Sequence, residues 1–367
     1  MTTTAHGTDD LTVVTTRPVV GPPDVPRTIG TRSFDDRASW MSAMVGAFAL
    51  VWIAFQLLAL SGKVGFTLLW FATYIAVYAG VTAMSNPWPV VQDRLVGAVV
   101  TGGAVVVGFA LATTLGYTFG KGFGAIRHLN FYTQDAAGVR PTAPLTQGGI
   151  LHAITGSAVE VGIALLISLP LGFGTAVYMT EVGGRAASTV RTVIEAMTAL
   201  PDVLAGLFTY AFLVLALGMD RTGFVAAIAL SVTMIPIVAR SAEVALRVVP
   251  GGLREASLAL GASQWQTVRR VVLPTAKAGL ATSLILGVAR VAGETAPLLI
   301  VSGASTYQNV NPFKDPMNSL PLYIFSAIRS GQPNAIARGF GAAAVLLGLV
   351  VVLFVIARLL ARPKATR

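Results

Sequence analysis

The chain has 367 residues, of which 54% are hydrophobic and only 11% are charged. Its mean hydropathy is +0.72, whereas a soluble globular domain carries about 25% charged residues, so the composition excludes a soluble protein and indicates one that crosses a membrane several times. The formal net charge of +10 comes from dispersed Lys and Arg without the aromatic-interleaved basic patch that binds nucleic acid, so we attribute it to the membrane flanks.

The first segment is polar and rich in proline, and we expect residues 1–38 to form a disordered cytoplasmic tail. It lacks the pattern of a signal peptide, because no apolar core begins before residue 41 and no small-residue cleavage pattern follows. A membrane helix needs about 20 apolar residues, and eight runs come close to or exceed this length. They lie at 39–60, 64–84, 95–119, 157–179, 196–218, 223–239, 278–302 and 340–360.

These runs predict an all-α polytopic membrane protein. The first two form a hairpin over 39–84, the other six form a transmembrane domain over 95–360, and a basic tail follows at 361–367. An even number of spans places both termini on one side, and most of the 26 Lys and Arg residues fall there. Because cytoplasmic loops are enriched in Lys and Arg, we expect both termini in the cytoplasm of a multi-pass cell-membrane protein, with loops 120–150 and 303–336 outside.

The main cytoplasmic loop in this topology, residues 240–277, contains "PGGLREASLALGASQWQTVRRVVLPTAKAG". The pattern predicts two short helices with a tight elbow, in which Gly261 supplies the left-handed residue that ends the first helix. Ser263 and Gln266 form a capping box that starts the second helix, and Pro274 is expected to stop it. Two interpretations remain open: a surface that a partner protein grips, or a basic amphipathic helix on anionic lipid.

The segment "GVARVAGETAPLLIV" at 287–301 carries Arg290 and Glu294 inside an apolar run. A charge at the centre of a membrane helix costs about 2.5–3.5 kcal/mol on insertion scales, so the pair needs an explanation. The two residues are four apart on one helix face and could form a structural salt bridge. The functional interpretation is a substrate pathway in which the Arg290 fork grips an oxyanion and Glu294 accepts a proton. Pro297 would weaken the helix beside them.

Other charged residues are weaker candidates. Asp202 follows Pro201, where the dipeptide more often marks a helix end or kink than a ligand, and Glu160 stands in an otherwise apolar run. Arg240 and Glu243 fall at the cytoplasmic boundary, where we expect solvated or lipid-facing charges. The sequence has no Walker motif, no cysteine and no metal-ligand spacing among its three histidines, so we expect no cofactor, metal or catalytic residue in this chain.

Two further patterns resemble a known family. The spacing from Glu255-Ala256-Ser257 through Gly261 to Leu273-Pro274 resembles the EAA loop of ABC-importer permeases, with Ser257 and Val271 as mild departures. The segments "ARVAGETAPLL", "NPFKDPMNSLPLYIF" and "FYTQ" resemble PstA-type permease subunits of phosphate importers, and the resemblance covers roughly 95–360. Asp202 and Glu160 depart from that family's pattern, and the hairpin at 39–84 is additional to its usual six spans.

The resemblance implies a type I ABC-importer permease fold with six core helices and an ATP-driven phosphate import function. It implies a substrate pathway at Arg290, Glu294 and Thr295. Asp202 and Glu160, which depart from the family's pattern, are further candidates for this pathway. The EAA-type loop would be the coupling helix that docks on the ATPase. The residues implied in coupling are Glu255, Ala256, Ser257, Gly261, Leu273 and Pro274.

The implied partners are a second, PstC-like permease, two ATPase subunits that bind ATP and Mg, and an extracellular phosphate-binding protein. The chain itself would not be an enzyme. Two alternatives stay open: a permease for another oxyanion such as molybdate, sulfate or phosphonate, and an ion-coupled secondary transporter or membrane sensor with no ATPase. The EAA-type spacing disfavours the second alternative.

Overall fold

The computed structural model describes residues 34–58 and 60–361, and every regular element in this part of the chain is a helix. The only β-type pairing there is an isolated bridge between Gly303 and Met317. Most of the expected tail 1–38 and nearly all of the basic tail 361–367 lie outside the described residues. Residues 34–38, which we expected in the tail, already belong to the first helix. The described chain is all-α, as predicted.

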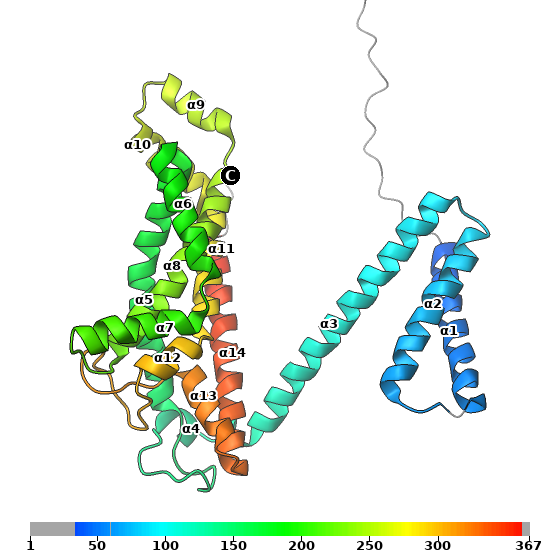
Figure 1. Ribbon diagram of the computed structural model, residues 1–367, viewed down its shortest axis with the longest axis horizontal. Helices are drawn as coiled ribbons and strands as arrows, with labels where there is room; N and C mark the ends of the chain where they lie inside the picture. Colours follow the sequence, from blue (N-terminus) through cyan, green and yellow to red (C-terminus); the bar gives the residue numbers. More distant parts are fainter. Residues whose placement is uncertain (1–33, 59, 362–367) are drawn as a thin grey trace, which may run out of the picture. The chain divides into compact units, whose positions relative to one another are not determined.

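The chain divides into two compact units, Met1–Ala110 and Leu111–Arg367, and α3 (Trp88–Ile126) contributes to both. In the first unit, α1 (Phe34–Leu57) and α2 (Lys63–Ala83) form a hairpin (Figure 1). Small buried residues of α1, Ala43 and Ala47, lie against the buried rings of Tyr74 and Tyr78 on α2. Small residues let membrane helices approach closely, so this seam explains why the first two apolar runs pair.

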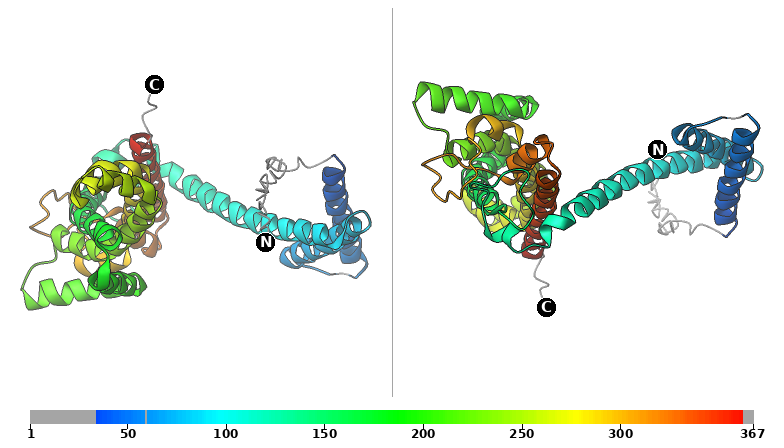
Figure 2. Two further views of the ribbon diagram at one scale, coloured as in Figure 1. Left: turned by 90° about the horizontal axis from the view of Figure 1, so that it is seen from above. Right: turned by 90° about the horizontal axis from the view of Figure 1, so that it is seen from below.

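The second unit contains the end of α3 and all later helices. In chain order these are α4 (Asn130–Thr133), α5 (Leu151–Val177) with its π-helical continuation η1 (Tyr178–Val182), α6 (Gly184–Ala199), α7 (Asp202–Thr209) with η2 (Tyr210–Ala216), α8 (Gly223–Arg247), α9 (Gly251–Ala259), α10 (Gln264–Thr267), η3 (Val268–Val272), α11 (Leu273–Ala292), α12 (Ala296–Val301), α13 (Leu320–Arg329) and α14 (Pro333–Ala361). Seen end-on, they gather into a bundle from which α7 and η2 project sideways (Figure 2).

Helix α8 forms the core of this unit. Its residues Leu230, Met234 and Val238 are fully buried, and they pack with residues of α5 and α11. The side chain of Thr222 caps its N-terminus by accepting a hydrogen bond of 3.4 Å from the backbone nitrogen of Val225. The first two thirds of α8, up to Ala239, carry no charged residue, and a helix segment that is apolar on nearly every face is expected to be buried among other helices.

Seven helices in the described residues are long and apolar enough to cross a membrane, or eight if one bent pair counts as a single span. That pair replaces the straight helix expected over 196–218. Helices α6 and α7–η2 meet at 101°, with extended backbone at Leu200 (ψ 132°) and Pro201 (ψ 134°). A residue before proline is disfavoured in the helical region, and this explains the break.

The expected span 278–302 is also broken. The observed helix runs from Gln264 through α10, η3 and α11 to Ala292, and the short α12 follows after a gap at 293–295. The expectation that Pro274 stops a helix was therefore wrong. The π-helical turn η3 ends at Val272, two residues before Pro274. A proline lacks an N–H and collides with the carbonyl four residues earlier, and the wider turn of η3 accommodates it. Pro297 instead occupies the first turn of α12, where its missing N–H costs nothing.

Candidate functional site

The two helix breaks described above lie together. Helix α7, which begins after one break, packs on α12, which begins after the other. A Cβ added at Gly206 would lie only 2.7 Å from the Cα of Pro297, so this approach requires glycine. The contact brings together segments that are far apart in the sequence and places charged residues from both breaks at one site.

Arg290 lies between two carboxylates. Its Nη2 atom is 3.0 Å from Oδ2 of Asp202, which is 88 positions away, and 3.5 Å from Oε1 of Glu294. The expected pairing of Arg290 with Glu294 is thus present, but the shorter contact is made to Asp202. The Arg290 side chain remains 51% exposed, so part of its guanidinium is accessible to other groups. One positive charge faces two negative ones, so the group is more than a neutral salt bridge.

A cavity of about 240 Å³ adjoins this group. Arg290 and Asp202 line it together with the hydroxyl-bearing Thr198 and Thr233, and the remaining lining residues are Met197, Leu200, Ala205, Val232, Pro236 and Ile237. The cavity therefore offers one strong hydrogen-bond donor and one carboxylate in a largely apolar wall. Such a wall suits a small anion that can also donate a proton.

Glu294 and Thr295 do not line this cavity. Glu294 approaches Arg290 from the gap between α11 and α12, and the carbonyl of Thr295 accepts a hydrogen bond of 3.1 Å from the backbone nitrogen of Leu299 at the start of α12. The structure therefore places Glu294 beside the guanidinium and Thr295 at the neighbouring helix start.

Glu160 lies elsewhere, fully buried within the bundle on α5. Ser302, just after α12, donates a hydrogen bond of 3.0 Å to its Oε1 atom, and the same hydroxyl contacts the carbonyl of Met317. Among the described residues Oε2 has no hydrogen-bond partner. These contacts tie α5 to both ends of the loop between α12 and α13.

Residues 250–267, which we call the α9–α10 arm, have the geometry expected for the elbow. Gly261 has a φ of +83°, a conformation that L side chains rarely adopt. The side chain of Ser263 accepts a hydrogen bond from the backbone nitrogen of Gln266, and the Gln266 side chain accepts one from the backbone nitrogen of Ser263. The predicted left-handed glycine and the predicted capping box are both confirmed.

The α9–α10 arm exposes a mixed surface. None of the residues of α9 is buried, and Glu255 and Ala256 are exposed. Leu260 is 89% exposed and Trp265 is 65% exposed. These exposed apolar side chains lie beside the exposed charge of Glu255, so the surface offers both apolar and charged groups to a partner. Ser257 instead faces the second helix of the arm, where its hydroxyl lies 2.9 Å from that of Thr267.

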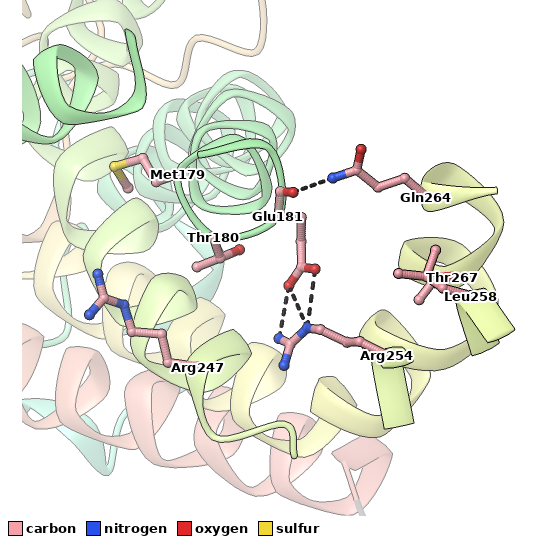
Figure 3. A pocket seen from close by; sticks show the side chains of 8 residues that line it. All are labelled: Met179, Thr180, Glu181, Arg247, Arg254, Leu258, Gln264 and Thr267. Atoms are coloured by element: carbon pink, nitrogen blue, oxygen red, sulfur yellow. Dashed lines mark hydrogen bonds and ion pairs between the residues drawn. The ribbon is translucent and has the colours of Figure 1, made fainter. Parts of the chain in front are cut away.

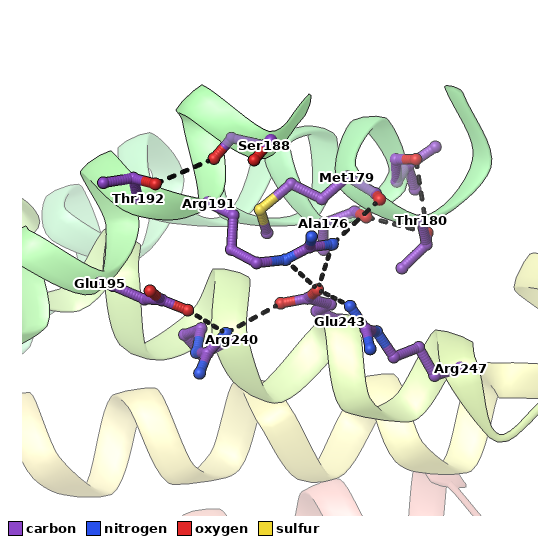
Figure 4. A network of polar contacts seen from close by, with 11 residues as sticks. Ala176, Met179, Thr180, Ser188, Arg191, Thr192, Glu195, Arg240, Glu243 and Arg247 are labelled. Atoms are coloured by element: carbon purple, nitrogen blue, oxygen red, sulfur yellow. Dashed lines mark hydrogen bonds and ion pairs between the residues drawn. The ribbon is translucent and has the colours of Figure 1, made fainter. Parts of the chain in front are cut away.

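A polar network around one buried carboxylate was not expected from the sequence. The side chain of Glu243 is only 3% exposed, and its carboxylate lies 2.9 Å from Arg191 on α6, 2.7 Å from Arg247 and 3.4 Å from Arg240 (Figure 4). Arg240 also reaches Glu195 at 3.2 Å. The interpretation of Glu243 as solvated or lipid-facing was wrong, because α6 folds back over this face of α8. The spacing of 240, 243 and 247 on one helix face was the available signal.

A family profile described as "Binding-protein-dependent transport system inner membrane component" matches residues 168–364, more than half of the chain. The chain belongs to this permease family. The matched region begins within α5 and includes the α9–α10 arm, Asp202, Arg290 and Glu294. Glu160 lies before it.

Curated relatives of this family member are named as phosphate transport permeases. "Phosphate transport system permease protein PstA 1" of Mycobacterium tuberculosis is 36% identical over 264 residues, which cover 72% of this chain and 86% of the relative. "Phosphate transport system permease protein PstA" of Haemophilus influenzae is 33% identical over 264 residues, which cover 71% of this chain and 91% of the relative. The alignments extend over most of both proteins.

The permease fold is also found among solved structures. A crystal structure of a bacterial alginate ABC transporter in complex with a pentasaccharide-bound periplasmic protein contains a chain that is 15% identical, with a TM-score of 0.51. The match covers 74% of this family member and 95% of that chain. At this identity the likeness supports the fold alone.

Proposed function

We propose that this chain is the transmembrane permease subunit of an ATP-driven phosphate importer and forms half of its translocation pathway. The observation that carries the proposal is the 36% identity to a phosphate transport system permease protein, in an alignment that covers 86% of that relative. The cavity with Arg290 and Asp202 supports it, because its chemistry fits a small oxyanion.

The arrangement of charges favours phosphate over a fully ionised oxyanion such as sulfate. The Arg290 guanidinium can hold two oxygens of an anion in a bidentate contact. The anion would then replace the Asp202 carboxylate as the partner of this guanidinium. A phosphate that keeps a proton can then donate it to the Asp202 or Glu294 carboxylate. A fully ionised sulfate has no proton to donate and would be repelled by both the Asp202 and the Glu294 carboxylates. The pair of carboxylates would therefore discriminate against sulfate.

The α9–α10 arm supports the assignment to an ABC importer. We propose that its exposed surface is the coupling helix and docks on an ATPase in the cytoplasm, with Glu255, Ala256 and the elbow at Gly261 in the contact. Ser257 would brace the arm from within through Thr267, and Leu273 and Pro274 would begin α11 behind the arm. With the bent α6–α7 pair counted as one span, both termini would then be cytoplasmic. Two ATPase subunits would bind ATP and Mg, a second, PstC-like permease would complete the pathway, and an extracellular phosphate-binding protein would deliver the substrate.

Phosphate uptake in cells that lack other phosphate systems tests this function. We expect uptake of labelled phosphate that depends on this chain and on an ATPase that co-purifies with it. Excess sulfate or molybdate should inhibit the uptake of labelled phosphate weakly in the native chain. The same anions should inhibit it strongly in Asp202→Asn, because an amide can donate a hydrogen bond to a fully ionised oxyanion. Uptake of sulfate or molybdate in preference to phosphate would favour the oxyanion alternative, and uptake without any associated ATPase would favour the secondary transporter.

A further inference from the structure

Both helices of the α9–α10 arm are bound to one residue at the end of α5. Arg254 on α9 makes a fork with the Glu181 carboxylate, with its Nη2 atom 2.9 Å from Oε1 and its Nε atom 3.2 Å from Oε2 (Figure 3). The Glu181 side chain is 7% exposed and that of Arg254 is 24% exposed. A bidentate pair with this little exposure fixes the relative orientation of the two side chains. We call it the Arg254–Glu181 bridge.

Arg254 also bonds to the end of α8. Its Nη2 atom donates to the carbonyl of Leu246 at 3.0 Å, and its Nη1 atom donates to the carbonyl of Val249 at 2.7 Å. Carbonyls at a helix C-terminus have no partner within the helix and are favourably bonded by a cation. One guanidinium therefore connects three elements: α9, the end of α8 and η1, which continues α5.

The second helix of the arm reaches the same place. The side-chain amide of Gln264, the first residue of α10, donates to the backbone carbonyl of Glu181. The hydroxyls of Ser257 and Thr267 link α9 to α10. The arm is thus braced internally and attached to η1 from both of its helices.

The arm depends on these polar contacts because little apolar packing lies beneath it. A cavity of about 640 Å³ separates it from the bundle, lined by Met179, Thr180, Glu181, Arg247, Arg254, Leu258, Gln264 and Thr267 (Figure 3). No residue of α9 is buried. Without the Arg254–Glu181 bridge, α9 could tilt into this space without displacing α5.

We propose that Arg254 and Glu181 are positioning residues for coupling: their bridge makes the α9–α10 arm and the end of α5 move as one body. The proposal rests on the proposed function and adds to it the route by which movement of the arm enters the bundle. Force applied to the exposed face at Glu255 would reach α5 through Glu181, in addition to the chain connections into α8 and α11. The bridge would therefore set how much transport results from each ATP hydrolysed.

The ratio of phosphate transported to ATP hydrolysed, measured on the complete transporter in liposomes, tests this role. We expect Arg254→Gln and Glu181→Gln to assemble with the ATPase and to hydrolyse ATP, while the ratio falls by about tenfold. The matched control is Arg269→Gln, which removes the same charge from an exposed residue that makes no ion pair in the described part of the chain. A ratio at the native level in both bridge variants would overturn the proposal.

A second variant tests the joint movement directly by replacing the ion pair with a covalent link. The chain contains no cysteine, so Glu181→Cys combined with Arg254→Cys can be joined specifically by a short bifunctional thiol reagent. The joined pair should recover the coupling ratio that the unjoined pair lacks, and a joined pair that stays uncoupled would refute the one-body movement. Absence of phosphate uptake by the native complex would instead refute the proposed function, so the two failures are distinguishable.

Discussion

Arg290 contacts two carboxylates, those of Asp202 and Glu294. The spacing of four residues pointed to Glu294, and the sequence could predict that contact because both residues share a helix face. It could not predict the closer contact to Asp202, because that contact requires two helix breaks to meet 88 positions apart. The sequence singled out Asp202 as a candidate pathway residue after a proline, but not as the partner of Arg290.

Replacing Arg290 by lysine separates a substrate contact from simple neutralisation. Arg290→Lys should lose phosphate uptake by about tenfold or more, close to the loss in Arg290→Gln, because an ammonium cannot make a bidentate contact worth roughly 1.5–3 kcal/mol. Uptake is measured after each variant is shown to reach the membrane at native abundance. Native uptake in the lysine variant would mean that Arg290 only balances Asp202 and Glu294.

Glu160 should behave as a structural residue. Glu160→Gln keeps an oxygen that can accept the hydrogen bond from Ser302, so we expect little change in uptake or in thermal stability. Glu160→Ala leaves Ser302 without this partner and should lower the free energy of unfolding by about 1–3 kcal/mol, seen as a lower melting temperature of the purified protein. Loss of uptake in the glutamine variant at unchanged stability would instead assign the carboxyl to the substrate pathway.

At the scale of elements, sequence periodicity found the helices but not where they bend. The apolar runs at 196–218 and 278–302 have the length of membrane helices. The length of a run does not reveal that the helix within it bends or breaks. Proline chemistry was visible at Pro201, Pro274 and Pro297, but only the structure shows which of them interrupts a helix. The capping box and the left-handed Gly261 were predictable because each depends on a few adjacent residues.

The elbow offers a prediction for the α9–α10 arm. Gly261→Val places a branched side chain at a φ of +83°, at a cost of about 1 kcal/mol or more, so the arm should reorient. We expect weaker association with the ATPase in a pull-down and a loss of uptake. Gly252→Ala, within α9 and with open space around its Cα, is the control and should leave both unchanged. Equal behaviour of the two variants would argue against the arm as the coupling element.

At the scale of the whole chain, composition and the apolar runs were enough to predict an all-helical membrane protein. The described residues contain seven candidate spans, and the predicted eight are reached only if the bent α6–α7 pair counts as one span. The ambiguity lies in the bent α6–α7 pair, which decides whether the number of crossings is odd or even. The number matters, because an even count is what places both termini on one side.

Cysteine labelling on this cysteine-free chain determines the orientation. Ser263 and Thr306 are both exposed, and they lie in the α9–α10 arm and in the loop after α12. A membrane-impermeant thiol reagent applied to intact cells should label Thr306→Cys and spare Ser263→Cys, which should react only after the membrane is opened. The opposite pattern would place the arm outside the cell and remove the basis for ATPase docking.

The paired helix breaks have a consequence for water. At 200–201 and 293–295 the main chain leaves the helical hydrogen-bond pattern inside segments that are otherwise apolar enough to cross a membrane. Irregular backbone at that depth is tolerated only where it is covered by protein or lines a hydrated space, because hydrocarbon offers no hydrogen bonds. The adjoining cavity of about 240 Å³ is large enough to hold several water molecules. The breaks would thus bring solvent to Arg290, and a hydrated guanidinium avoids most of the cost of a charge in lipid.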